Sequence, residues 1–245
     1  MAATTRKSLI PPADIPAERL FRMEGDQFRR AVEAGAIPVA DGVVLAKGLL
    51  HTRGNGGPLY RMDLDQYHRL VDNGILDERH QTELLGGWIV AKMPINPPHQ
   101  TATRKTRAEL SRRVPRGWFV DQNAPISLPF SDSEPEPDVV VIRGDLRDFA
   151  ERHPGSGDTA LVIEVAHSSL AEDRGFQKRL YAVEGIPVYW IVNLVDLQIE
   201  VCTEPSGPSE APDYQTRRDY KPGDSVPLVI EDQQRGLIPV AGLLP

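Results

Sequence analysis

The sequence is short of cysteine and of long apolar runs. Cys202 is the only cysteine among 245 residues, so an internal disulfide is impossible and a cysteine-rich zinc site is not expected. No apolar run reaches the length of about 18 residues that a membrane-spanning helix needs, and the first residues lack the apolar core of a signal peptide. We therefore expect a cytoplasmic protein with no membrane partner.

Positive charge is also scarce. The chain has 28 Lys and Arg against 35 Asp and Glu, a net charge of −7. This argues against a generally cationic nucleic-acid binder but allows a local basic groove. The most basic window is the predicted helix at residues 99–114, and it fits a solvated helix face and a phosphate-facing surface equally well. The basic residues of this window are Arg104, Lys105, Arg107, Arg112 and Arg113.

Two stretches near the start of the chain resemble each other. Residues 20–37 match residues 59–76 at an offset of 39, and residues 41–47 match residues 86–92 at an offset of 45. We interpret this as a duplicated helix–strand unit whose second copy carries a six-residue insertion containing Glu83, where the first copy offers Pro38. We expect residues 1–57 to form an N-terminal extension holding a degenerate copy, led by an extended or flexible segment at residues 1–17, and residues 58–245 to form the main domain.

The main domain alternates strand and helix patterns. Continuous apolar residues predict buried strands at 139–142, 159–166 and 186–193, and a half-exposed strand at 197–204. An apolar stripe predicts a helix at 170–185. We expect a polar surface loop at 203–224, a last strand at 225–232 and an apolar tail at 236–245. The fold class is therefore mixed α/β (α+β), a central mixed sheet flanked by helices.

Two of the predicted strands carry a carboxylate. Asp138 begins the first and Glu164 lies inside the second, where an unpaired charge costs several kcal/mol or raises the pKa. If the strands are neighbours, the two acids can hold Mg²⁺ or Mn²⁺, with the Lys178 ammonium near water or phosphate. Alternatively, Asp138 caps a turn and Glu164 pairs with a surface Lys178. Residue spacing alone favours this second, structural interpretation.

A family resemblance reverses that balance. From Leu59 onward the chain resembles the Uma-type family of restriction endonucleases, in the PD-(D/E)xK superfamily. The matching segments are RMDLDQYHRLVDNGILDE, TELLGGWIVAKMPINPPHQ, EPEPDVVVI, ALVIEVAHSSLAEDRGFQKRLYAVEGIPVYWIVN and PGDSVPLVI. The resemblance implies a restriction-endonuclease-like core and metal-dependent hydrolysis of phosphodiester bonds. It also carries the metal-binding acids of the superfamily onto Asp138 and Glu164.

The remaining site residues follow from the same resemblance. The superfamily lysine usually lies two residues after the glutamate, where this chain has Ala166, so Lys178 on the following helix is the candidate. Glu83 matches an acidic family position and is a candidate metal or water ligand. His99 matches a histidine that opens a helix, where it could reach a phosphate or cap the helix.

Three functions are therefore weighed. The first is an endonuclease that depends on Mg²⁺ or Mn²⁺ and cuts nucleic acid, with DNA as the expected substrate. The second is a catalytically inactive nuclease-fold module that binds nucleic acid or a protein partner. The third is a structural role for the duplicated unit, which could mediate a homodimer.

Overall fold

The computed structural model describes residues 15–38, 42–52 and 57–245. The predicted lead-in at 1–17 lies outside these residues, apart from residues 15–17. Two compact units form: a first unit of Met1–Lys92 with Pro129–Pro135, and a second unit of Met93–Leu128 with Glu136–Pro245. The predicted domain boundary after residue 57 was drawn from the extent of the family resemblance and not from the packing of the chain. It stays a prediction. Within the described residues, no helix is long and apolar enough to cross a membrane.

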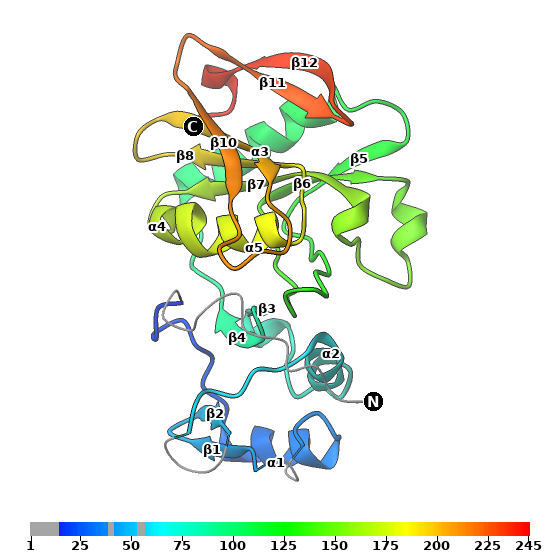
Figure 1. The fold of residues 1–245 in the computed structure, drawn as a ribbon, viewed down its shortest axis with the longest axis vertical. Helices are drawn as coiled ribbons and strands as arrows, with labels where there is room; N and C mark the ends of the chain where they lie inside the picture. The colour runs from blue at the N-terminus through cyan, green and yellow to red at the C-terminus, as the bar shows by residue number, and fades with distance from the viewer. Residues whose placement is uncertain (1–14, 39–41, 53–56) are drawn as a thin grey trace. The chain divides into compact units, whose positions relative to one another are not determined.

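A six-stranded sheet forms the centre of the second unit, in the order β10-β9-β8-β7-β6-β5 (Figure 1). Its strands are β5 (Trp118–Asp121), β6 (Val139–Arg143), β7 (Thr159–Ala166), β8 (Val188–Asn193), β9 (Gln198–Pro205) and β10 (Tyr214–Tyr220). β7 and β8 run parallel, and all other neighbours run antiparallel. Every residue of β7 and β8 is buried, which confirms the two buried strands and the mixed sheet expected from the sequence.

Both faces of this sheet are covered (Figure 1). One face carries α3 (Pro97–Ser111) and the hairpin of β11 (Ser225–Ile230) and β12 (Gln233–Pro239). The other carries α4 (Leu170–Glu172), a π-helical segment (Asp173–Gln177) and α5 (Lys178–Val183). α3 begins two residues before the predicted start at 99 and ends at Ser111 rather than at 114. It begins early because the Asn96 side chain accepts the His99 N–H and Pro97 fits the first helical turn.

Two expectations at the C-terminal end are wrong. Residues 203–224 are not one loop, because β9 continues to Pro205 and β10 pairs with it along the edge of the sheet. β10 is buried only at its two ends, Tyr214 and Tyr220, and the exposed residues between them gave the segment its polar composition. The strand at 225–230 is not the last one either, because β12 pairs with it and takes up part of the predicted apolar tail.

In the first unit, both predicted copies have a helix followed by a hairpin, and the hairpins lie at the same spacing from their helices, without the predicted insertion. Its elements are α1 (Gly25–Glu33), β1 (Val44–Ala46), β2 (Leu49–His51), α2 (Leu64–Asp72), β3 (Thr82–Leu85) and β4 (Trp88–Ala91). The β1–β2 hairpin turns at Lys47 and Gly48, with φ of 51° and 82°, and the β3–β4 hairpin turns at Gly86 and Gly87, with φ of 59° and 85°. The offset is therefore 39 throughout (86 − 47), with no six-residue insertion.

The corrected alignment changes the counterpart of Glu83. At an offset of 39, Glu83 matches Val44 rather than Pro38. The sequence comparison had matched the stretch at 41–47 to the wrong strand of the second hairpin, because short apolar strands resemble one another.

Cys202 allows a simple check of the second unit. It lies buried on β9, where burial raises the pKa of its thiol to about 11. We expect no reaction with a thiol reagent at about pH 8 in the native protein and one equivalent after unfolding in denaturant. Rapid labelling of the native protein, followed by absorbance, would contradict the placement of β9 inside the sheet.

Candidate active site

Asp138 and Glu164 meet at one end of the sheet. The antiparallel register pairs Val139 of β6 with Ile163 of β7, so Asp138 lies beside Glu164 and Val165. The Asp138 N–H donates to Glu164 Oε2 at 3.3 Å, and the Val165 N–H donates to Asp138 Oδ2 at 2.7 Å. Each strand thus holds the carboxylate of the other, which fixes both side chains.

His99 joins this pair from the first turn of α3. Its Nε2 lies 3.1 Å from Asp138 Oδ2, and both side chains are mostly buried. Burial alone lowers the pKa of His99, but the hydrogen bond and charge of Asp138, with the charge of Asp173, outweigh it and raise the pKa. The site therefore favours an imidazolium beside its carboxylates. Asn96, not His99, caps the helix.

Two residues of the site were not singled out from the sequence. The Tyr181 hydroxyl on α5 donates to Glu164 Oε1 at 2.7 Å, and both residues are buried. Asp173 lies buried in the π-helical segment and accepts the Ser169 hydroxyl at 2.7 Å. π-helical turns often mark functional sites, but the sequence shows only a continuous helix pattern there. Both residues fall inside the matching segment at 160–193, which was the available signal.

Lys178 does not reach the carboxylates. Its Nζ lies 2.8 Å from Asp213 Oδ1, in the loop between β9 and β10, and among the described residues it forms no ion pair with Asp138 or Glu164. The structural alternative, in which Glu164 pairs with Lys178, is therefore not what the structure shows. Ala166, at the usual position of the lysine, is fully buried at the end of β7.

Glu83 belongs to the first unit. It lies buried on β3, and its Oε1 is 3.1 Å from Arg19 Nη2. Its predicted role as a metal or water ligand stays a prediction. The three predicted residues that the structure brings together are Asp138, Glu164 and His99.

The donor set at Asp138 and Glu164 fits a hard divalent ion. Asp138 Oδ1 accepts no hydrogen bond from any described residue, so one carboxylate oxygen is open to a ligand. The described residues contain no group of three or more His, Cys, Asp and Glu side chains arranged around a metal. Mg²⁺ is commonly bound by one or two carboxylates and keeps several waters, whereas zinc needs more protein ligands. The residues present therefore fit Mg²⁺ or Mn²⁺ better than zinc.

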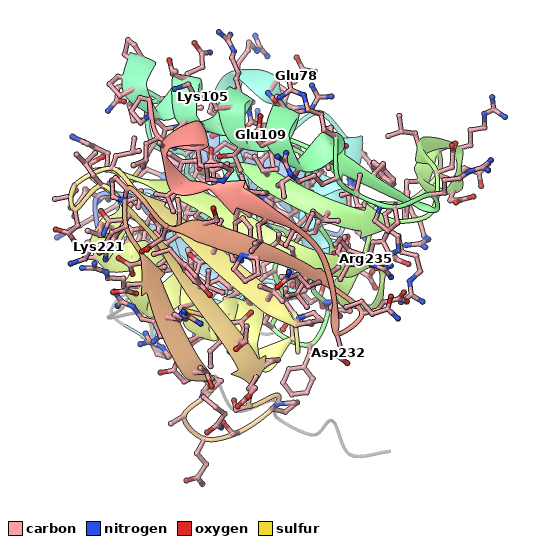
Figure 2. All side chains as sticks on the ribbon, turned by 90° about the horizontal axis from the view of Figure 1, so that it is seen from above. Glu78, Lys105, Glu109, Lys221, Asp232 and Arg235 are labelled. Carbon is pink, nitrogen blue, oxygen red and sulfur yellow. The ribbon has the colours of Figure 1, made fainter. Side chains whose placement is uncertain are left out.

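Fewer basic side chains of residues 99–114 are available to a ligand than the sequence indicates. On α3, where Figure 2 labels Lys105 and Glu109, the Lys105 ammonium donates to the Leu244 carbonyl at 2.6 Å, and Arg112 and Arg113 pair with Glu109. Arg104 and Arg107 on the same helix are exposed, and no described residue forms an ion pair with them.

Arg174, in the π-helical segment, is also engaged in ion pairs. It pairs with the fully buried Glu200 of β9 and, at 3.0 Å, with Asp196. Because a buried carboxylate needs this compensation, Arg174 is a structural residue in the described protein.

The His99–Asp138 pair should make stability depend on pH. The pKa of His99 is raised in the folded state, so the stabilisation is complete below the unfolded value of 6.5 and is lost as pH rises through the folded pKa. In chelator, His99→Gln should lower the free energy of unfolding more at about pH 5.5 than at about pH 9, measured by denaturant unfolding. His153→Gln, at an exposed histidine, is the control; equal losses from His99→Gln at both pH values would contradict the charged pair.

Comparisons with known proteins identify the family and the fold. A family model described as "Uma2: Putative restriction endonuclease" matches residues 64–240. A crystal structure described as "a putative nuclease belonging to DUF820", from Anabaena variabilis ATCC 29413, is 15% identical with a TM-score of 0.56, and covers 74% of this chain and 97% of that chain. This likeness confirms the predicted nuclease fold. No curated protein matches. The family match spans most of the chain, and the chain belongs to the Uma2 family of restriction-endonuclease-like proteins.

Proposed function

We propose that this protein is a metal-dependent endonuclease that hydrolyses phosphodiester bonds in DNA. The observation that carries the proposal is the carboxylate pair, Asp138 and Glu164, held by reciprocal backbone hydrogen bonds with Asp138 Oδ1 open. The family match supports the proposal, because its description reads "Putative restriction endonuclease". A cytoplasmic homodimer able to cut both strands is the assembly that this function suggests.

Asp138 and Glu164 would hold Mg²⁺ or Mn²⁺, and such an ion supplies positive charge for the phosphate and lowers the pKa of a water molecule. Tyr181 is a positioning residue, because its hydroxyl fixes Glu164 Oε1. His99 would contribute a proton at Nε2, and the hydrogen bond and charge of Asp138 favour the protonated imidazole by raising its pKa against the effect of burial. A protonated Nε2 can donate to a phosphate oxygen or to the leaving oxygen.

Two other predicted site residues, Lys178 and Glu83, are paired with residues outside the proposed metal site. Lys178 can orient water or phosphate only after it leaves Asp213. Glu83 has its Oε1 3.1 Å from Arg19 Nη2, and its role as a metal or water ligand stays a prediction. Arg104 and Arg107 form no ion pair with a described residue and are our candidates for contacts with the DNA backbone.

Removing a carboxylate tests the proposal directly. With Mg²⁺ or Mn²⁺, the purified protein should cut labelled duplex DNA, and Glu164→Gln should lower the rate by at least about a hundredfold, because the metal site loses a charged ligand. Single-stranded DNA and RNA are assayed alongside the duplex. Glu210→Gln, at an exposed carboxylate, is the matched control and should keep full activity. If the Glu164→Gln protein still cuts the duplex, the cleavage does not depend on the carboxylate pair, and Asp138 and Glu164 are excluded as the catalytic site.

Tyr181→Phe tests whether the Tyr181 hydroxyl orients a metal ligand or only packs in the core. Loss of the hydroxyl that orients a metal ligand should reduce activity about tenfold to a hundredfold. The concentration of metal needed for half-maximal rate should rise with it, which a purely structural tyrosine would not change. Unaltered metal dependence in steady-state kinetics would assign Tyr181 to the core alone.

A second candidate function is a nuclease-fold module without catalysis. The observation in its favour is that Ala166 stands where the lysine is usual, while Lys178 pairs with Asp213. A thermal-unfolding titration with Mn²⁺ separates the two functions. If the protein is a metal-dependent endonuclease, Mn²⁺ should raise its Tm by several degrees, and Glu164→Gln should abolish this rise. If the protein is a module that holds no metal, Mn²⁺ should leave its Tm unchanged.

A further inference from the structure

The two repeats of the first unit are joined symmetrically. We define copy 1 as residues 20–51 and copy 2 as residues 59–90. Each copy donates backbone hydrogen bonds at positions that differ by 39 (62 − 23). These are Met23 N–H to Gly48 O at 2.8 Å with Met62 N–H to Gly87 O at 2.8 Å, and Phe21 N–H to Ile89 O at 2.9 Å with Tyr60 N–H to Leu50 O at 2.8 Å. The second pair runs from each copy to the other, so residues of the two copies can be equated one by one.

In copy 2, a segment from a distant part of the chain binds the outer side of the hairpin. The segment is Asp132–Ser133–Glu134, and Glu134 forms an antiparallel bridge with Leu84 of β3. Three short hydrogen bonds join it to the backbone of the hairpin. Two are between backbone groups, Glu134 N–H to Leu84 O at 2.7 Å and Gly87 N–H to Asp132 O at 2.9 Å, and the third runs from Gly86 N–H to the Ser133 Oγ at 2.8 Å. The hairpin thus supplies one acceptor and two donors to an extended peptide.

A helix residue recognises the acidic side chain of this segment. His68 on α2 lies with its Nε2 2.8 Å from Glu134 Oε2. Glu134 is buried, so its carboxylate is recognised inside the unit rather than in solvent. The occupied site therefore selects an extended Asp–Ser–Glu segment by its backbone, one hydroxyl and one carboxylate.

Copy 1 has the same groups, and no segment among the described residues occupies them. The equivalents of Leu84, Gly86 and Gly87 are Leu45, Lys47 and Gly48, and no described residue hydrogen-bonds the Leu45 carbonyl or the N–H groups of Lys47 and Gly48. Residues 44–49 are half-buried or exposed, whereas residues 83–88 are buried. The turn geometry is also equivalent, since Lys47 and Gly48 share the positive φ values of Gly86 and Gly87.

Charge complementarity is stronger in copy 1. Arg29 on α1 takes the place of His68, and its side chain is 68% exposed and paired only with the exposed Asp26 among described residues. An arginine is charged at every physiological pH and can bind a carboxylate through two N–H groups, unlike a histidine. The exposed Lys47 lies at the same turn.

We propose that copy 1 is a binding site for an extended acidic peptide segment of a partner protein. The peptide adds to the outer side of β1, as in β-strand addition. Its main chain binds Leu45 and Gly48, a serine-like hydroxyl accepts the Lys47 N–H, and a glutamate pairs with Arg29. A second copy of this chain is a poor occupant, because its own Asp132–Glu134 segment is already bound to copy 2.

The test uses the full chain and a fluorescein-labelled peptide with the sequence of residues 130–136, FSDSEPE. Fluorescence anisotropy should show saturable binding of one peptide. Arg29→Glu should raise Kd by about threefold to tenfold, as expected for the reversal of one exposed charge. The matched control is Arg79→Glu, which also removes an exposed arginine paired with a neighbouring aspartate and should leave Kd unchanged.

Two further measurements make the result decisive. In amide NMR spectra, the peptide should shift the N–H signals of Lys47 and Gly48. A peptide with glutamine in place of the glutamate equivalent to Glu134 should bind as weakly as the Arg29→Glu variant binds the original. The proposal is overturned if no binding saturates by about 1 mM, or if a scrambled peptide binds equally. It is also overturned if binding depends on His68 rather than Arg29, since the peptide would then be displacing the segment in copy 2.

Discussion

The burial of Glu164 is the constraint on which the second unit depends. It lies in β7, a strand of eight residues that are all buried, where an unpaired carboxylate costs several kcal/mol. Its compensation comes from two directions: the Asp138 N–H from the preceding strand, and the Tyr181 hydroxyl from the crossover helix, 17 residues along the chain. The antiparallel β6–β7 pair and the parallel β7–β8 crossover are thus both needed to keep this one charge in the sheet.

The same constraint explains which parts of the site the sequence could predict. An acid next to consecutive apolar strand residues stands out in a sequence, so Asp138 and Glu164 could be singled out as candidates. The strand patterns left open whether the two strands are neighbours, and the register of β6 with β7 brings the two acids together. His99 came from the family resemblance, and the structure brings it to Asp138. Tyr181 was hidden because a buried tyrosine on an amphipathic helix looks like core. The position of Lys178 depends on Asp213, in a loop whose path no local pattern specifies.

Errors elsewhere have related causes. The polar residues of β10 gave no alternation of apolar and polar positions, because only Tyr214 and Tyr220 at its ends are buried. The repeat was found from its helices, whose capping and stop residues are distinctive, but its hairpins were misaligned because strand sequences of three or four residues carry little information. Backbone hydrogen bonds at equivalent positions, and not side-chain similarity, establish the offset of 39 (62 − 23).

Charge balance links the residues of the site. Asp138 lies with its Oδ2 3.1 Å from His99 Nε2, and the negative charges of Asp138 and Asp173 raise the pKa of His99 against the effect of burial. A divalent ion bound by Asp138 and Glu164 would also offset the negative charge of these carboxylates. A protonated His99 and a bound ion would therefore both offset the charge of Asp138. Because the pKa of His99 is raised by its acidic neighbours, an ion that offset their charge would lower this pKa again and would make the proton on Nε2 easier to release.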